Sequence, residues 1–254
     1  MIRFGWWTTG RDEAAVKLLD TALKAMDSGE VLGEISYVFL SREKGESKYS
    51  DEIMQIATKH NIPCPTVSAK KYEPELRQQD RALWRDVYHK KVLELISPYG
   101  QDVAILAGYM WVVSEEACKK MKLLNLHPAL PGGPQGTWQE VIWKLLDERA
   151  ESTGAMMHLV TPELDRGPAV AFFSFTINGA EWDDLWKDLD EKIEDLGSLQ
   201  EVKKVIGESL PIFRKIRNKG ESRELPLIVA TMRAISRGEI DLDTMEKCPM
   251  ELRV

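Results

Sequence analysis

The stretch "DVAILAG" (102–108) decides the fold, because it has the composition of a strand buried on both faces. An almost unbroken apolar run closed by a glycine is typical of a central parallel strand between two layers of helices. Comparable runs occur before and after it, at 2–7 ("IRFGWW"), 34–41 ("EISYVFLS"), 62–67 ("IPCPTV") and 123–128 ("LLNLHP"). Because amphipathic segments separate these runs, the pattern predicts an open, mainly parallel α/β sheet.

Helical periodicity predicts the elements between the strands. An amphipathic helix follows Asp12, and a second spans 49–61 with Ser50 as its N-cap. We expect one long helix over roughly 75–97 and shorter ones at 114–121 and 136–150. Two further strands, 154–160 and 168–177, flank the turn "TPELDRG".

The pattern changes near residue 180, where strands give way to highly charged helical sequence. We therefore divide the chain into an α/β domain at 1–180 and a helical C-terminal extension at 181–254, in which we expect no strand. We expect the extension to pack on the sheet. The sequence does not decide whether the protein is a monomer or a homodimer.

Composition excludes several classes of protein. The formal net charge of −7 argues against nucleic acid and anionic membranes as partners, which require a basic surface. The 3 cysteines lie far apart, the N-terminus resembles no signal peptide, and no apolar run reaches the ~20 residues of a membrane span. These features predict a cytoplasmic protein.

Two further classes are disfavoured by the absence of their motifs. The 4 histidines do not cluster at ligand spacing, so we expect no metal. The absence of GxGxxG after the first strand argues against a dehydrogenase.

Asn125 and His127 are the first candidates for chemistry. Pro128 favours an extended backbone at His127, and residues two apart on a strand point to the same face. An amide beside an imidazole, where a strand of an open α/β sheet ends, can form an oxyanion hole or an acid–base pair. The alternative is a hydrogen-bonded structural turn.

Asp165 is the second candidate, in the turn between the last two predicted strands. An aspartate in a turn commonly caps its own backbone, so a catalytic role requires this turn to lie beside Asn125 and His127. Neighbouring strands make that arrangement plausible. His158, within the preceding strand, is expected to support the site. Trp6 and Trp7 are expected in the core, with one of them a candidate floor for a ligand.

Three motifs in order, "VAILAGYMWVVS", "LNLHPALPGG" and "STGAMMHLVTPELDRGP", resemble the folate-dependent formyltransferase superfamily. The resemblance covers roughly residues 1–180 and is strongest to the phosphoribosylglycinamide formyltransferases. Those enzymes have Asn-x-His-Pro-Ser-Leu, then Gly-x-x-x-His-x-Val and Asp-x-Gly-Pro. The resemblance implies a Rossmann-like fold and transfer of a formyl group from 10-formyltetrahydrofolate, the co-substrate, to a small amine, which can be phosphorylated. Glycinamide ribonucleotide (GAR), in purine biosynthesis, is the first candidate acceptor.

The resemblance also implies roles for individual residues. Asn125 and His127 would stabilise the developing oxyanion, and Asp165 would control the protonation of the imidazole and help to remove the proton of the amine. His158 and Gly136 would support them. The folate would contact Gly108, Tyr109, Met110, Trp111, Val112, Val113, Thr161 and Glu163.

Departures from the family pattern leave the acceptor open. The phosphate-binding turn Gly-x-Gly-Ser-Asn is replaced by "TTGRD", in which we expect Thr9, Gly10, Arg11 and Asp12 to bind the acceptor. A C-terminal Lys–Glu pair of the family corresponds only approximately to Lys219 and Glu221. A formyltetrahydrofolate hydrolase and a sugar-nucleotide formyltransferase therefore remain alternatives, and a non-catalytic folate-binding protein is a rival of another class. Methionyl-tRNA formyltransferase is less favoured, because the tail is helical and not basic.

Overall fold

The computed structural model describes residues 1–254 and has one seven-stranded sheet in the order β2-β1-β3-β4-β5-β6-β7. The strands are β1 (Ile2–Thr8), β2 (Gly33–Leu40), β3 (Val103–Leu106), β4 (Leu123–His127), β5 (Ser152–Leu159), β6 (Ala169–Thr176) and β7 (Met250–Glu251). The first four form a parallel set, whereas β5 is antiparallel to both β4 and β6. The predicted α/β class is confirmed, with an antiparallel half that the sequence pattern did not reveal.

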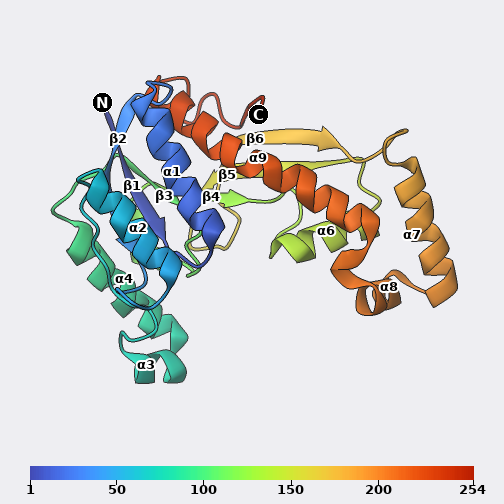
Figure 1. Cartoon of the computed structure of the whole chain (residues 1–254), viewed down its shortest axis with the longest axis horizontal. Helices are drawn as coiled ribbons and strands as arrows, with labels where there is room; N and C mark the ends of the chain where they lie inside the picture. Colours follow the sequence, from blue (N-terminus) through green and yellow to red (C-terminus); the bar gives the residue numbers. More distant parts are fainter.

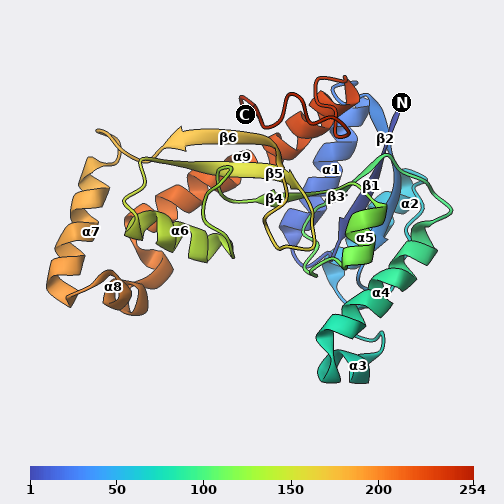
Figure 2. The same cartoon turned by 180° about the vertical axis from the view of Figure 1, so that it is seen from behind.

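Helices cover both faces of the sheet (Figures 1 and 2). On one face α1 (Glu13–Asp27) packs beside α2 (Lys48–Lys59) and α9 (Pro211–Ser236). On the other lie α4 (Arg81–Ile96) and α5 (Glu115–Lys120), and α3 (Pro74–Gln79) projects from the body just before α4. A third apolar cluster joins α6 (Trp138–Asp147), α7 (Asp183–Leu196), α8 (Leu199–Val205) and the first half of α9. A short 3-10 helix (Gly207–Ser209) precedes α9. None of the helices combines the length and apolar character of a membrane span.

Two helix predictions were wrong in detail. The predicted long helix 75–97 is two helices, because Asp80 is extended and its carboxylate caps α4 by accepting from the N–H groups of Ala82 and Leu83. The N-cap of α2 is Ser47 and not Ser50, whose hydroxyl instead donates to the carbonyl of Ser47.

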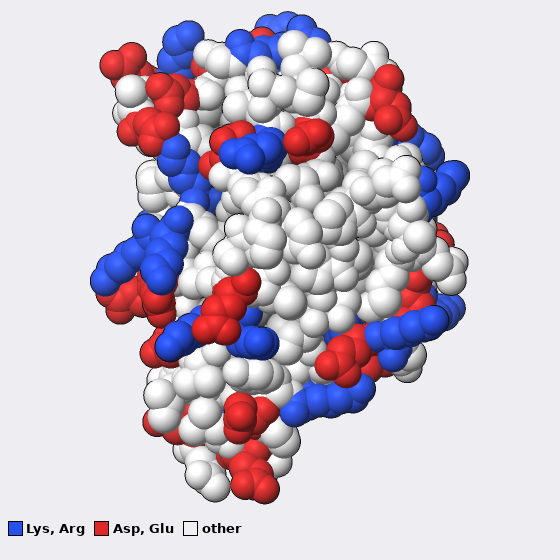
Figure 3. Space-filling model, turned by 90° about the vertical axis from the view of Figure 1, so that its left-hand side faces the viewer, with Lys and Arg blue, Asp and Glu red and all other residues white.

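The predicted strand 62–67 makes only one bridge, between Leu40 and Thr66, although its chain runs along β2. Pro63 and Pro65 accept hydrogen bonds from Val38 and Leu40 but have no N–H to return. This segment contains no charged residue. The face of the molecule drawn in Figure 3 also has no Lys, Arg, Asp or Glu over most of its centre. The segment therefore covers an edge that would otherwise be open to pairing.

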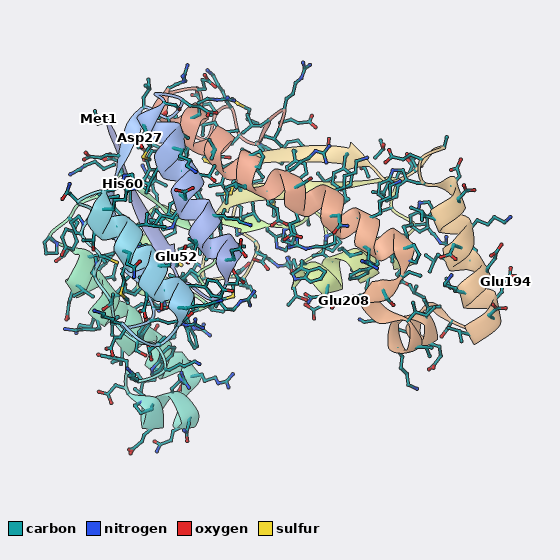
Figure 4. The ribbon with its side chains drawn as sticks, viewed as in Figure 1. Met1, Asp27, Glu52, His60, Glu194 and Glu208 are labelled. Atoms are coloured by element: carbon teal, nitrogen blue, oxygen red, sulfur yellow. The ribbon has the colours of Figure 1, made fainter.

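The C-terminal region contains one strand that we did not expect, the two-residue β7, which pairs with β6. Most of the region is helical as predicted. Leu227 and Met232 of α9 lie in the same buried cluster as Phe4 and Leu19, so the extension and the sheet share a core. Glu194 on α7 and Glu208 lie at the end of the molecule away from Met1 (Figure 4). The domain boundary at residue 180 stays a prediction.

Candidate active site

Strand β4 places Asn125 and His127 on one face of the sheet, with Leu124 buried in the core on the other. Asn125 lies beside Leu106, the last residue of β3, and opposite His158 of β5. The antiparallel pairing of β4 with β5 therefore brings His158 to the amide.

The turn between β5 and β6 carries Asp165. Its ends are joined by a 3.0 Å hydrogen bond from the N–H of Leu159 to the carbonyl of Pro168. Gly167 permits this closure, since a Cβ there would lie 1.6 Å from the carbonyl oxygen of Leu159. Asp165 has φ of 54°, a left-handed conformation that aspartate tolerates better than most residues. The chain is thus folded so that this one carboxylate points back toward β4.

The carboxylate of Asp165 lies between the two histidines. Its Oδ2 is 3.6 Å from Nδ1 of His127, and its Oδ1 is 3.9 Å from Nε2 of His158. The side chains of His127, His158 and Asp165 are only 3%, 2% and 10% exposed. A catalytic role for Asp165 required its turn to lie beside β4, and the turn does lie there.

His158 orients the amide of Asn125. The Nδ1–H of His158 donates to the carbonyl of Leu159, at 3.0 Å, which leaves Nε2 as an acceptor 3.5 Å from Nδ2 of Asn125. Burial lowers the pKa of His158, although the Leu159 carbonyl and Asp165 act in the opposite direction. The neutral His158 ring therefore accepts a hydrogen bond from one N–H of the Asn125 amide, and the second N–H of that amide points away from His158.

His127 has a hydrogen-bond acceptor at each ring nitrogen. Nε2–H donates to the carbonyl of Pro134, at 2.8 Å, and Nδ1 faces Asp165. A neutral imidazole has one N–H and can donate a hydrogen bond to only one of these acceptors, whereas a doubly protonated ring can donate to both. The two acceptors fix the orientation of the ring, with Nδ1 turned toward the carboxylate of Asp165.

A cavity of about 160 Å³ opens where β3 ends, with Asn125, His158 and Asp165 in its wall. Of the residues predicted to contact a folate, six line it: Tyr109, Met110, Trp111, Val112, Val113 and Thr161. Gly108 and Glu163 lie outside the lining, Glu163 being exposed on the turn. Leu106, Val160 and Leu164 also line the cavity and were not predicted. Leu106 and Val160 had a usable signal, since they belong to the predicted strands 102–108 and 154–160, close to the C-terminal end of each.

A buried polar pair supports the cavity from behind. The Tyr109 hydroxyl donates to Nε2 of His89, at 3.0 Å, and Nδ1–H of His89 donates to the carbonyl of Arg85. Trp7 packs edge-on against Tyr109, with 5.4 Å between the ring centroids. Both Trp6 and Trp7 are fully buried, so neither forms the floor of the cavity and the core prediction holds.

His89 gives the protein a pH-dependent stability. Burial lowers its pKa from 6.5 to about 4. Because the unfolded imidazole binds its proton first, stability is full above pH 6.5 and falls as the pH drops toward 4, by about 3 kcal/mol from this group. We expect His89→Gln to lower stability at neutral pH and to flatten this acid loss by about that amount, measured by urea unfolding between pH 7.5 and 4. Parallel pH profiles of the variant and the parent protein would contradict the assignment.

The turn "TTGRD" lies at the end of β1 but does not line the cavity. The hydroxyl of Thr9 accepts from the N–H of Met110 and from Ser41, which fixes the turn against the 108–113 segment. Gly10 has φ of 56°, and a Cβ there would lie 2.8 Å from the Cα of Ser50. Asp12 caps α1 by accepting from Ala15, and Arg11 pairs with Asp12 at 3.1 Å.

Three other predicted residues lie outside this arrangement. Gly136 immediately precedes Thr137, the N-cap of α6. Lys219 and Glu221, on α9, pair with Glu181 and Arg217. The remaining histidine, His60, lies at the end of α2 (Figure 4) and does not line the cavity.

Fold and site together define a Rossmann-like α/β protein with an Asn–His–Asp site where a central strand ends. The family described as "Formyl transferase" matches residues 18–201. The phosphoribosylglycinamide formyltransferase of Saccharomyces cerevisiae is 30% identical over 159 residues, 59% of this chain and 72% of the yeast protein. The chain belongs to the formyl transferase family.

Solved structures agree on the fold. The phosphoribosylglycinamide formyltransferase of Coxiella burnetii superposes with a TM-score of 0.64 at 15% identity, over 99% of each chain. The glycinamide ribonucleotide transformylase 1 of Symbiobacterium toebii gives 0.62 at 16% identity, over 100% of this chain and 94% of the other. The whole chain, including the helical C-terminal region, thus has counterparts in that fold.

Proposed function

We propose that the protein transfers the formyl group of 10-formyltetrahydrofolate to the amine of glycinamide ribonucleotide. The observation that carries the proposal is the position of Asp165, between His127 and His158 and in the wall of the cavity that contains Asn125. A protein that only binds folate needs no such convergence. The yeast relative, of which the chain covers 72%, supports the choice of acceptor.

Each residue of the site would have a separate role. The free N–H of the Asn125 amide would face the oxygen of the transferred formyl group, where negative charge develops. His127 does not line the cavity and its two ring nitrogens face Pro134 and Asp165, so a protonated His127 would stabilise that oxygen by its charge and not by a direct hydrogen bond. As the amine forms its bond to the formyl carbon and the bond from that carbon to the folate nitrogen breaks, Asp165 would accept the proton of the amine, directly or through water, and this proton would pass to the leaving folate nitrogen. His158 would keep the amide in place.

The cavity suits the donor. Of its 12 lining residues 8 are hydrophobic, which fits a flat heterocycle, and the polar groups are gathered on one side. Tyr109 to Val113 and Thr161 would contact the folate, with Gly108 and Glu163 in flanking positions. Thr9 to Asp12 would contact the acceptor, and the guanidinium group of Arg11 would bind its phosphate.

One observation favours a second candidate, the hydrolysis of formyltetrahydrofolate. Asp12 places a carboxylate at the N-terminus of α1, where a phosphate of the acceptor would otherwise receive N–H donors. If that carboxylate excludes the phosphate, water becomes the acceptor at the same three residues.

The experiment mixes the purified protein with 10-formyltetrahydrofolate, with and without GAR, and follows the deformylated folate by absorbance. We expect release that depends on GAR. Release of equal rate without GAR would establish the hydrolase instead. No release under either condition, with folate still bound, would overturn both candidates and favour another amine or a binding role.

A further inference from the structure

Two hydroxyl groups join the turn after β1 to the wall of the catalytic cavity. Thr9, in the turn, and Ser41, which directly follows β2, are only 5% and 2% exposed, and their hydroxyl oxygens lie 3.0 Å apart. Thr9 Oγ1 accepts the backbone N–H of Met110 at 3.0 Å, and Ser41 Oγ accepts the indole N–H of Trp111 at 3.2 Å. Met110 and Trp111 both line the cavity. We call Thr9 and Ser41 the hydroxyl pair.

The hydroxyl pair has one hydrogen more than its partners in the protein can accept. Backbone and indole N–H groups only donate, so both hydroxyl oxygens act as acceptors toward the cavity wall. One of the two hydroxyl hydrogens forms the bond between Thr9 and Ser41, whichever residue donates it. The other hydrogen has no acceptor in the protein. A nearly buried O–H group without an acceptor is unfavourable, and it is satisfied when an oxygen from outside the protein lies beside it.

The position of the hydroxyl pair indicates which ligand supplies that oxygen. Neither Thr9 nor Ser41 lines the catalytic cavity, so a folate held there contacts Met110 and Trp111 and not the pair. Thr9 directly precedes Gly10 and the other residues of the turn that we assign to the acceptor. Glycinamide ribonucleotide presents phosphate and ribose oxygens, each of which can accept the free hydrogen. The acceptor substrate is therefore the ligand in reach of the pair.

We propose that Thr9 and Ser41 are positioning residues that couple the two substrates, so that binding of the acceptor raises the affinity for the folate. The inference rests on the proposed function. A hydroxyl that donates a hydrogen bond becomes a stronger acceptor for the bonds it receives. An acceptor oxygen bound to the pair thus strengthens the bonds to the N–H of Met110 and to the indole of Trp111. The N–H of Thr9, which donates to the carbonyl of Gly108 at 3.2 Å, ties the turn to the same segment.

The test measures the Kd of tetrahydrofolate, the deformylated donor, by isothermal titration calorimetry with and without saturating GAR. We expect GAR to lower this Kd about fivefold, and tetrahydrofolate to lower the Kd of GAR by the same factor, because coupling between two sites is reciprocal. In Thr9→Val and in Ser41→Ala the factor should fall close to one. Thr9→Ser, which keeps the hydroxyl, should retain most of it.

The ratio of the two Kd values separates coupling from a structural role. A variant that only distorts the cavity wall raises the Kd of tetrahydrofolate equally with and without GAR, and leaves the ratio unchanged. The matched control is Thr231→Val, which makes the same chemical change at a buried threonine. The hydroxyl of Thr231 donates within α9, to the carbonyl of Leu227, so this variant should keep the full ratio.

Two outcomes would overturn the coupling and leave the proposed function intact. One is an unmodified protein that formylates GAR but has the same Kd for tetrahydrofolate with and without it. The other is a fivefold ratio that persists in both Thr9→Val and Ser41→Ala. A protein that neither formylates nor binds GAR would fail first in the turnover assay, and the coupling would then be overturned together with the proposed function.

Discussion

Asp165→Asn should reduce kcat by about 10³-fold or more while folate binding is largely retained. The carboxylate is the only acid in the wall of the catalytic cavity, and it faces both histidines. An amide of the same shape cannot accept the proton of the amine, nor can it stabilise a protonated His127 by charge. Asparagine is at least as well suited as aspartate to the left-handed backbone of residue 165, so the turn should keep its conformation.

The measurement combines steady-state kinetics with folate binding, read from the tryptophan fluorescence of the protein, to which Trp111 in the cavity contributes. Asp27→Asn provides the control, since it makes the same chemical change at the exposed end of α1, outside the lining of the cavity. Turnover of the Asp165 variant within a few-fold of the parent protein would remove Asp165 from the mechanism. Loss of folate binding together with turnover would make its role structural.

The sequence predicted the parts of the site that depend on local geometry. Asn125 and His127 share a face because residues two apart on any strand do so, and Pro128 keeps that strand extended at its end. This inference needs no knowledge of which strands are neighbours. The position of the segment 109–113 in the cavity was instead implied by the resemblance to the formyltransferases.

The proximity of Asp165 and His158 to Asn125 depends on long-range pairing and could not be predicted in this way. It follows from the antiparallel direction of β5, which no periodicity reveals, and from a turn that Gly167 closes against Leu159. The hollow lined by Arg77, Arg81 and Arg85 was missed for a related reason. The predicted helix 75–97 was continuous, and only the break at Asp80 places Arg77 on one helix and Arg81 and Arg85 on the next, around one hollow.

Asn125→Ala should lower kcat by about 10²- to 10³-fold, the usual consequence of removing one donor from an oxyanion site. The amide has a defined orientation only because the Nε2 of neutral His158 accepts one of its N–H groups. His158→Leu should therefore lower kcat about tenfold, because the Asn125 amide is then free to rotate. His158→Gln, which can supply an acceptor oxygen in place of Nε2, should recover part of that loss.

The double variant decides how His158 acts. If the histidine works through the amide, it has nothing to orient once Asn125 is alanine, and Asn125→Ala/His158→Leu should have nearly the kcat of Asn125→Ala alone. His158 also lies 3.9 Å from Asp165, so an independent route through the carboxylate is structurally available. If the two single effects multiply in the double variant, His158 acts independently of the direction of Asn125, and the contact with Asp165 is the route.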